Sequence, residues 1–179
     1  FFATSAVRSD GTAIGVTRVR CIPDSLGNLA VYVATATGGV TGDADDPETD
    51  LGAIAAMLWQ YCEPQAVNAT PVSATPVVIN VALSLYCYDN VGMTDAQINA
   101  AVNSALTDWL KLQYIGGNRL SGEINGYVYR DQISHYASVA PEVFRAAVTT
   151  PATDVEIEPH EVPVLGTVTV TIYREAAVL

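Results

Sequence analysis

The chain has 179 residues, half of them apolar, with 19 acidic and 8 basic side chains and a formal net charge of −11. This length is enough for one ordinary domain or two small ones with a packed core. The arginines and the single lysine, Lys111, are scattered, whereas electrostatic binding to nucleic acid or to an anionic membrane requires clustered bases. We therefore expect no nucleic-acid partner and no membrane partner, and no stretch approaches the roughly 18 consecutive apolar residues of a transmembrane helix.

The chain begins at Phe1 instead of Met, and its first residues do not form a signal peptide, so we expect a fragment of a longer polypeptide. Its three cysteines, Cys21, Cys62 and Cys87, show no metal-ligand spacing. An odd number of cysteines without a leader predicts reduced thiols in a cytoplasmic setting. We expect all three side chains to be buried or half-buried.

The first ninety residues predict the order strand, strand, helix, strand. Residues 14–22 alternate apolar and polar side chains with one irregularity. The expected core face of this strand carries Ile14, Val16, Val19 and Cys21. Turn formers at 23–28 and a second alternation over 29–36 complete a hairpin. The odd-numbered residues of 77–86 are all apolar, which makes this segment the clearest strand of the chain.

Between the hairpin and that strand, residues 47–62 predict an amphipathic helix. Asp46 is the expected N-cap, with Pro47 at the first helical position. The apolar stripe of the helix is formed by Leu51, Ile54, Ala55, Leu58 and Cys62.

The second half predicts two helices followed by two strands. Thr94 and Gln97 have the spacing of a capping box, and the helix that they begin is expected to stop at Gly116 and Gly117. A shorter helix is expected at 128–138. The two predicted strands are 142–149 and 166–173.

This order predicts an α+β fold made of two small consecutive units, each with a mixed or antiparallel sheet and helices packed on one face. The first unit is expected to span residues 1–90 and the second residues 91–179. The break at 89–92, which reads Asp-Asn-Val-Gly, is the predicted boundary.

No catalytic motif is visible, and we expect no enzyme activity, no cofactor and no metal site. The pentapeptide G-x-S-x-G is absent, so Ser121 is interpreted as a loop residue. His135 and His160 have no further ligand at zinc spacing. The carboxylates of 43–50 lack the glycine and glutamate positions of an EF-hand, and a solvated loop before a helix explains them.

Several segments carry a resemblance to a known family. Gly15–Val19 and Gly27–Val33 form the predicted hairpin, and Thr70–Val81 leads into the clearest strand. Within 151–170, the run Glu161–Gly166 reads E-V-P-V-L-G before alternating Thr and Val. Together with the order of helices, these segments resemble the middle to C-terminal part of baseplate J-like proteins, which include the gpJ-type subunits of phage tails.

The likeness covers about residues 12–173 and departs at 139–143, where the family has a glycine before the valine. It implies a non-catalytic, structural role in wedge assembly of a contractile phage-type tail baseplate, in a phage, a prophage or a related injection machine. The implied partners are other baseplate and tail proteins: wedge subunits, a gpW-like protein and sheath-proximal parts, in homo- or hetero-oligomers. Assembly is expected in the host bacterial cytoplasm.

Two other classes of function remain open from the sequence. A virion-surface or extracellular carbohydrate-binding module would use exposed aromatic rings, although Trp59 and Trp109 lie beside apolar helix positions where packing is the more common use. A hydrolase with a scattered acid pair would have no recognisable motif.

Overall fold

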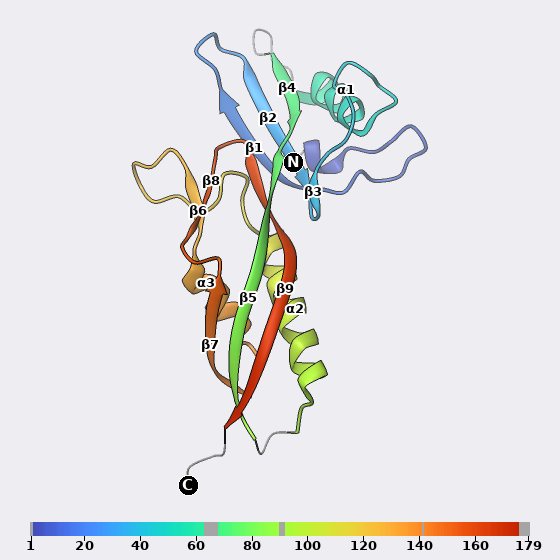
Figure 1. Cartoon of the computed structure of the whole chain (residues 1–179). Coiled ribbons are helices and arrows are strands. Elements are labelled where there is room, and N and C mark those ends of the chain that lie inside the picture. Colours follow the sequence, from blue (N-terminus) through green and yellow to red (C-terminus); the bar gives the residue numbers. More distant parts are fainter. Residues whose placement is uncertain (1, 63–67, 90–91, 141, 176–179) are drawn as a thin grey trace.

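The computed structural model describes residues 2–62, 68–89, 92–140 and 142–175. Two layered halves lie end to end and give the molecule an elongated shape, with the first strands at one end and the C-terminal residues near the other (Figure 1). Helices and strands both contribute, in mixed sheets, so the predicted α+β class is confirmed. The predicted boundary at 89–92 includes residues 90 and 91, which lie outside the described residues.

The first half contains a mixed sheet with one long helix. The hairpin of β1 and β2 is antiparallel, and β4 pairs with β2 in parallel. At the hairpin turn, the Asp24 carboxylate accepts the N–H groups of Leu26 and Asn28, both at 2.8 Å. The elements are η1 (Phe2–Ser5), β1 (Val16–Pro23), β2 (Leu29–Thr35), β3 (Gly38–Gly39), α1 (Asp50–Cys62) and β4 (Ala69–Ser73).

Helix α1 begins three residues later than the sequence predicts, so the expected cap at Asp46 is wrong. The Thr49 hydroxyl accepts the N–H of Gly52 at 3.1 Å, which is the geometry of an N-cap. The carbonyl of Asp46 instead accepts from the backbone and hydroxyl of Thr49. A Cβ on Gly52 would lie 1.9 Å from this carbonyl oxygen, so a glycine is needed where the loop meets the helix.

The second half contains a three-stranded sheet in the order β7-β5-β9. β5 is antiparallel to β7 and parallel to β9, and α2 and α3 cover one face of the sheet (Figure 1). The predicted capping box of α2 is confirmed, with Thr94 and Gln97 exchanging hydrogen bonds. The elements are β5 (Thr75–Tyr88), α2 (Asp95–Lys111), β6 (Gly126–Val128), α3 (Arg130–Ala137), β7 (Val143–Thr150), β8 (Val155–Ile157) and β9 (Glu161–Glu175).

The chain passes from one sheet to the other at Ala74. The Ala74 N–H donates to the carbonyl of Val33 on β2, and the next N–H, of Thr75, donates to the carbonyl of His160 just before β9. β5 therefore pairs with strands of the second half, although the sequence analysis grouped it with the first. The units 1–90 and 91–179 remain a prediction, while the hydrogen-bonded sheets change over at residue 74.

Each half has its own apolar core, and a small third cluster joins them. The larger core packs β5 against α2 and α3, and the smaller packs the first sheet against α1 and η1. Ala34, Ala74, Ile115 and Val162 form the third cluster, with one or more residues from each half. Because this cluster is small, hydrogen bonds between the two halves also contribute to their relative placement.

The most buried charged side chain of the described residues, Arg18, lies at this junction, where the sequence predicted an apolar face. Val19 and Cys21 were expected on the core face of β1, but burial alternates without a break along this strand, with Val16 and Arg18 both inward, so Val19 and Cys21 are exposed. The inward position is taken by Arg18, which is 6% exposed. Its guanidinium donates to the carbonyls of three residues: Thr35, Leu110 at 3.4 Å and Pro163 at 3.0 Å. Burial lowers the pKa of Arg18.

A second irregularity falls in β9, at Gly166. Asn80 faces two residues, Gly166 and Thr167, instead of one. The Asn80 side-chain oxygen accepts the N–H of Thr167 at 2.9 Å. A Cβ on Gly166 would lie 2.3 Å from the same oxygen and 2.7 Å from Cγ1 of Val78, so a larger residue would displace the side chains that pack at the bulge.

We predict that Arg18→Met lowers the free energy of unfolding by about 2–4 kcal/mol, because methionine leaves buried carbonyl groups without their donor. Urea denaturation measures this difference. Arg119→Met is the matched control, since Arg119 is exposed and its loss is expected to change stability by no more than about 0.5 kcal/mol. Equal stability of the two variants would contradict the role of Arg18.

We predict that Gly166→Ala costs about 1–3 kcal/mol by forcing the Asn80 side chain out of the bulge. In an Asn80→Ala background the same substitution should cost less, because the clash with the Asn80 oxygen is absent and only the close contact with Val78 remains. A double-mutant cycle by thermal unfolding tests the coupling. Additive costs would show that Asn80 and Gly166 act independently.

Candidate assembly surface

The face of the β7-β5-β9 sheet that the helices leave open carries small side chains in its middle part. Along β5 the odd-numbered residues from Ile79 to Cys87 are buried against the helices, so the even-numbered residues point the other way. Ala82 lies opposite Thr169, and Ser84 lies between Ala147 and Thr171. This part of the face offers short side chains and hydroxyl groups to a neighbouring surface.

At the distal end of that face, four aromatic rings gather. We call Tyr86, Tyr88, Phe144 and Tyr173 the aromatic patch. Tyr86 and Tyr173 stack with centroids 5.2 Å apart, and Tyr88 and Phe144 are 4.7 Å apart. Tyr88, Phe144 and Tyr173 are each nearly half exposed. The patch draws on β5, β7 and β9, at the end of the molecule furthest from α1 (Figure 1).

A positive charge lies over this patch. The Arg145 guanidinium carbon is 5.2 Å from the centre of the Tyr86 ring, which is the geometry of a cation–π contact. Arg145 lies opposite Tyr86 in the strand register and is exposed. Tyrosine and arginine are the residue types that dominate binding energy in protein interfaces, so the composition of the patch suits an interface.

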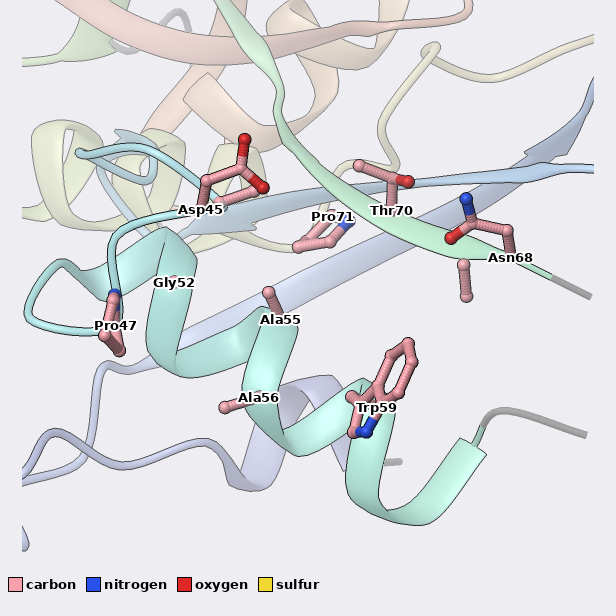
Figure 2. Close-up of a pocket in the computed structure, with 11 residues that line it drawn as sticks. Asp45, Pro47, Gly52, Ala55, Ala56, Trp59, Asn68, Thr70 and Pro71 are labelled. Carbon is pink, nitrogen blue, oxygen red and sulfur yellow. The ribbon is translucent and has the colours of Figure 1, made fainter.

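A second candidate surface is a groove between α1 and β4, with a volume of about 470 Å³ (Figure 2). Its lining includes Gly52, Ala55, Ala56 and Trp59, which share one side of α1 because they are spaced at i, i+3, i+4 and i+7. The Trp59 side chain is 73% exposed and points toward β4. Packing was expected for Trp59, and this prediction is wrong because the core stripe of α1 lies on another side of the helix.

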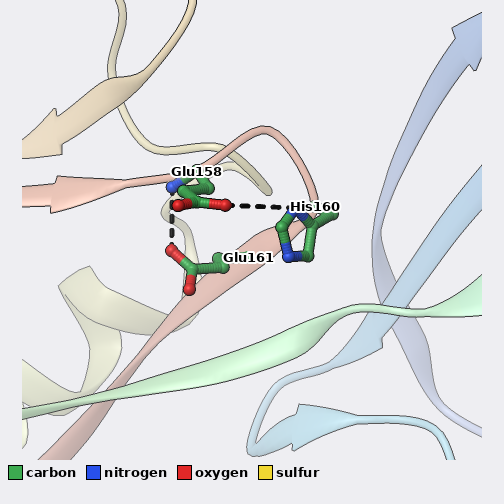
Figure 3. A group of neighbouring side chains, drawn as sticks. All are labelled: Glu158, His160 and Glu161. Carbon is green, nitrogen blue, oxygen red and sulfur yellow. Dashed lines mark hydrogen bonds and ion pairs between the residues drawn. The ribbon is translucent and has the colours of Figure 1, made fainter.

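The third candidate is the turn that precedes β9, where Glu158, His160 and Glu161 bring their ligand atoms within 4.8 Å of one another (Figure 3). The Glu161 carboxylate accepts the N–H of Glu158 at 2.8 Å, and His160 Nδ1 is 3.7 Å from the Glu158 carboxylate. Among the described residues, this is the group of acidic and histidine side chains whose ligand atoms lie close enough together to share one ion. The contacts among them also explain the arrangement as a closed turn, and the expectation of no metal stays a prediction.

The remaining residues considered in the sequence do not come together into a site. His135 lies on α3 beside Tyr136, and Ser121 lies in an exposed turn. Trp109 is buried and stacks on Tyr136 with centroids 5.0 Å apart, as expected. Among the carboxylates of 43–50, Asp43 and Asp46 accept backbone N–H groups of their own loop, and Asp50 pairs with Arg8.

The cysteines divide into different environments. Cys87 is buried in the larger core, and burial raises the pKa of its thiol. Cys21 is exposed on β1, against expectation, because it alternates with the inward-facing residues Val16, Arg18 and Arg20. The side chain of Cys62 lies outside the described residues.

The aromatic patch was missed in the sequence because its members are far apart along the chain. Tyr86 and Tyr88 occupy alternate positions of the clearest strand, and Tyr173 ends the Thr–Val alternation. The sequence indicates that such positions lie on an exposed face, but it does not show which residues of other strands lie beside them. The strand register brings them together.

Comparison with known proteins gives the family. Within the described residues, no helix is long and apolar enough to cross a membrane. No curated protein matches the sequence. The family model described as the baseplate J-like protein C-terminal domain matches residues 79–171, slightly more than half of the chain. This family consists of structural phage proteins, which gives the chain a structural role in the phage tail baseplate. The chain therefore belongs to the baseplate J-like family, of which it represents the C-terminal part.

Proposed function

We propose that the chain is a non-catalytic wedge component that assembles with neighbouring baseplate subunits through the open face of the β7-β5-β9 sheet. The observation that carries this proposal is the aromatic patch with Arg145 above it. A continuous cluster of half-exposed rings is costly to leave in water and is typical of an interaction site. The helices already cover the opposite face of the sheet.

The part of the face with small side chains supports the same proposal. Small side chains at Ala82, Ser84 and Ala147 let another backbone or helix approach closely. Hydroxyl groups of Thr169 and Thr171 supply hydrogen bonds at the edge of such a contact. A neighbouring subunit would thus place its apolar anchor on the patch and a polar rim on the threonines.

The partners that we propose are other wedge subunits, a gpW-like protein and sheath-proximal parts, joined during assembly in the host cytoplasm. A carbohydrate-binding module is the less favoured alternative. Tyr86 stacks on Tyr173 and also lies 5.2 Å from the Arg145 guanidinium carbon, so its ring is already engaged within the chain, whereas sugar binding uses an open ring face. A glycan array is expected to give no saturable binding.

We predict that Tyr173→Asp weakens the complex with co-expressed baseplate subunits by at least about 30-fold, since a charge would replace a ring in a desolvated contact. Quantitative co-purification followed by titration of the separated partners measures the loss. Trp59→Asp is the matched control, because Trp59 is 73% exposed and lies away from the patch, on α1.

Thermal unfolding of both variants must show that they fold. If folded Tyr173→Asp protein binds its partners as tightly as the Trp59→Asp control, the open sheet face is not the assembly surface.

A further inference from the structure

Half of the basic side chains of the chain come together at the junction of the two halves, although they are scattered along the sequence. Two adjoining pockets lie there, between β1 and the loop that follows α2, with volumes of about 400 and 370 Å³. Both are lined by Val19, Tyr114 and Ile115, and we call them together the junction groove. Its lining includes four of the eight bases and no acidic side chain among the described residues: Arg18, Arg20, Lys111 and Arg119.

Two of these four bases are already engaged within the chain. Arg18 donates to three carbonyl groups, and the Lys111 ammonium lies 3.5 Å from the Asp108 carboxylate. The other two, Arg20 and Arg119, have no acidic partner within ion-pair distance in the part of the chain that the structure describes. These two arginines form the basic end of the groove.

Glycines hold the two unpaired arginines close to each other. Arg20 donates to the Ile115 carbonyl at 3.1 Å, and a Cβ on Gly116 would overlap its Nη1, so the side chain lies directly on this glycine. A Cβ on Gly126 would overlap the Gly116 carbonyl oxygen and would lie 3.0 Å from Cγ of Arg119. Both arginines therefore pack around the backbone of Gly116, within reach of one anion in the pocket that they line.

The two positive charges are also close enough to repel each other. Burial and the charge of Arg119 both lower the pKa of Arg20, as expected when a cation loses water and meets a like charge. A carboxylate between the two guanidinium groups would accept hydrogen bonds from both and would replace this repulsion by attraction. The basic end of the groove is therefore suited to an anion from outside the chain.

The other end of the groove distinguishes a protein segment from a free anion. Leu112 and Tyr114 are largely exposed there, and Ala36 leaves space beside them. Large apolar side chains next to a basic pair are costly to leave in water, and a free phosphate would leave them uncovered. An apolar side chain next to the carboxylate of a peptide would cover them. The chemistry of the groove thus fits a segment that is both acidic and apolar.

We propose that the junction groove binds an acidic segment of a partner protein, with a glutamate or aspartate carboxylate between Arg20 and Arg119. An apolar neighbour of that acid packs on Leu112 and Tyr114. The groove is separate from the aromatic patch and provides a second point of attachment. It rests on the proposed function only in requiring a protein partner.

The test is a titration of the ¹⁵N-labelled full chain with the peptide acetyl-Leu-Glu-Leu-amide at constant ionic strength, followed by the backbone ¹H–¹⁵N signals of residues 112–119. We expect saturable shifts. The peptide with glutamine in place of glutamate has nearly the same shape without the charge and should bind at least about 5-fold more weakly. The peptide acetyl-Gly-Glu-Gly-amide should bind at least about 3-fold more weakly, because it leaves the apolar end uncovered.

Substitutions of single arginines sharpen the result. Arg119→Gln should weaken binding of acetyl-Leu-Glu-Leu-amide about 5-fold or more, because Arg119 is exposed and its loss removes one of the two donors. Arg8→Gln is the matched control with the same change of net charge. Arg8 is exposed and pairs with Asp50 outside the groove, so we expect less than about a 2-fold effect. Thermal unfolding checks that both variants fold.

Equal affinity for the glutamine peptide, equal affinity for the glycine peptide, or equal effects of Arg119→Gln and Arg8→Gln would each overturn the proposal. Inorganic phosphate that binds residues 112–119 as tightly as acetyl-Leu-Glu-Leu-amide would also overturn it and would indicate a phosphate site. No baseplate subunit is present in this titration. Its failure would therefore leave the aromatic patch untouched as an assembly surface, and failure at the patch would leave the junction groove untouched.

Discussion

Two arginines of β1 connect the two halves of the molecule: the buried Arg18, with the most hydrogen bonds, and Arg20, which donates to the Ile115 carbonyl at 3.1 Å. Arg18 reaches from β1 to a carbonyl on β2, to one near the C-terminal end of α2 and to one on β9, so its donors connect both halves. No acid pairs with Arg18 in the part of the chain that the structure describes, and the negative end of α2 supplies a partial compensation. Because a planar group must satisfy acceptors in fixed directions, this contact defines an orientation that the small apolar cluster alone would leave loose.

The residues that carry the family resemblance serve this junction. In the run Glu161–Gly166, the Glu161 carbonyl accepts the N–H of Gly116, and Val162 is fully buried in the joining cluster. Pro163 offers its carbonyl to Arg18, and Gly166 forms the bulge against Asn80. The recognisable sequence is thus the part that builds the architecture, while the proposed contact surfaces lie at positions that no motif marks.

The sequence predicts features that depend on neighbouring residues in the chain, and it does not predict those that depend on distant segments. Local rules predicted the capping box at Thr94, the alternation of β5 and the α+β class, because each depends on neighbours in the chain. They failed at Arg18, where carbonyl groups from distant segments allow a charged side chain to take an inward position of β1, and at the start of α1, where Gly52 approaches Asp46 closely. The aromatic patch could not be predicted, since three strands must be in register before its rings meet.

The junction between the two halves determines how the two proposed surfaces are placed relative to each other. The aromatic patch lies at the end of β5 and β9, and the junction groove lies beside the start of β9, so the long strands separate them (Figure 1). A subunit that holds two partners loses less entropy on the second contact when the first has already fixed its position. That advantage requires the halves to keep one relative orientation. A buried arginine with several directional hydrogen bonds meets that requirement better than an apolar patch of the same size, which would allow sliding.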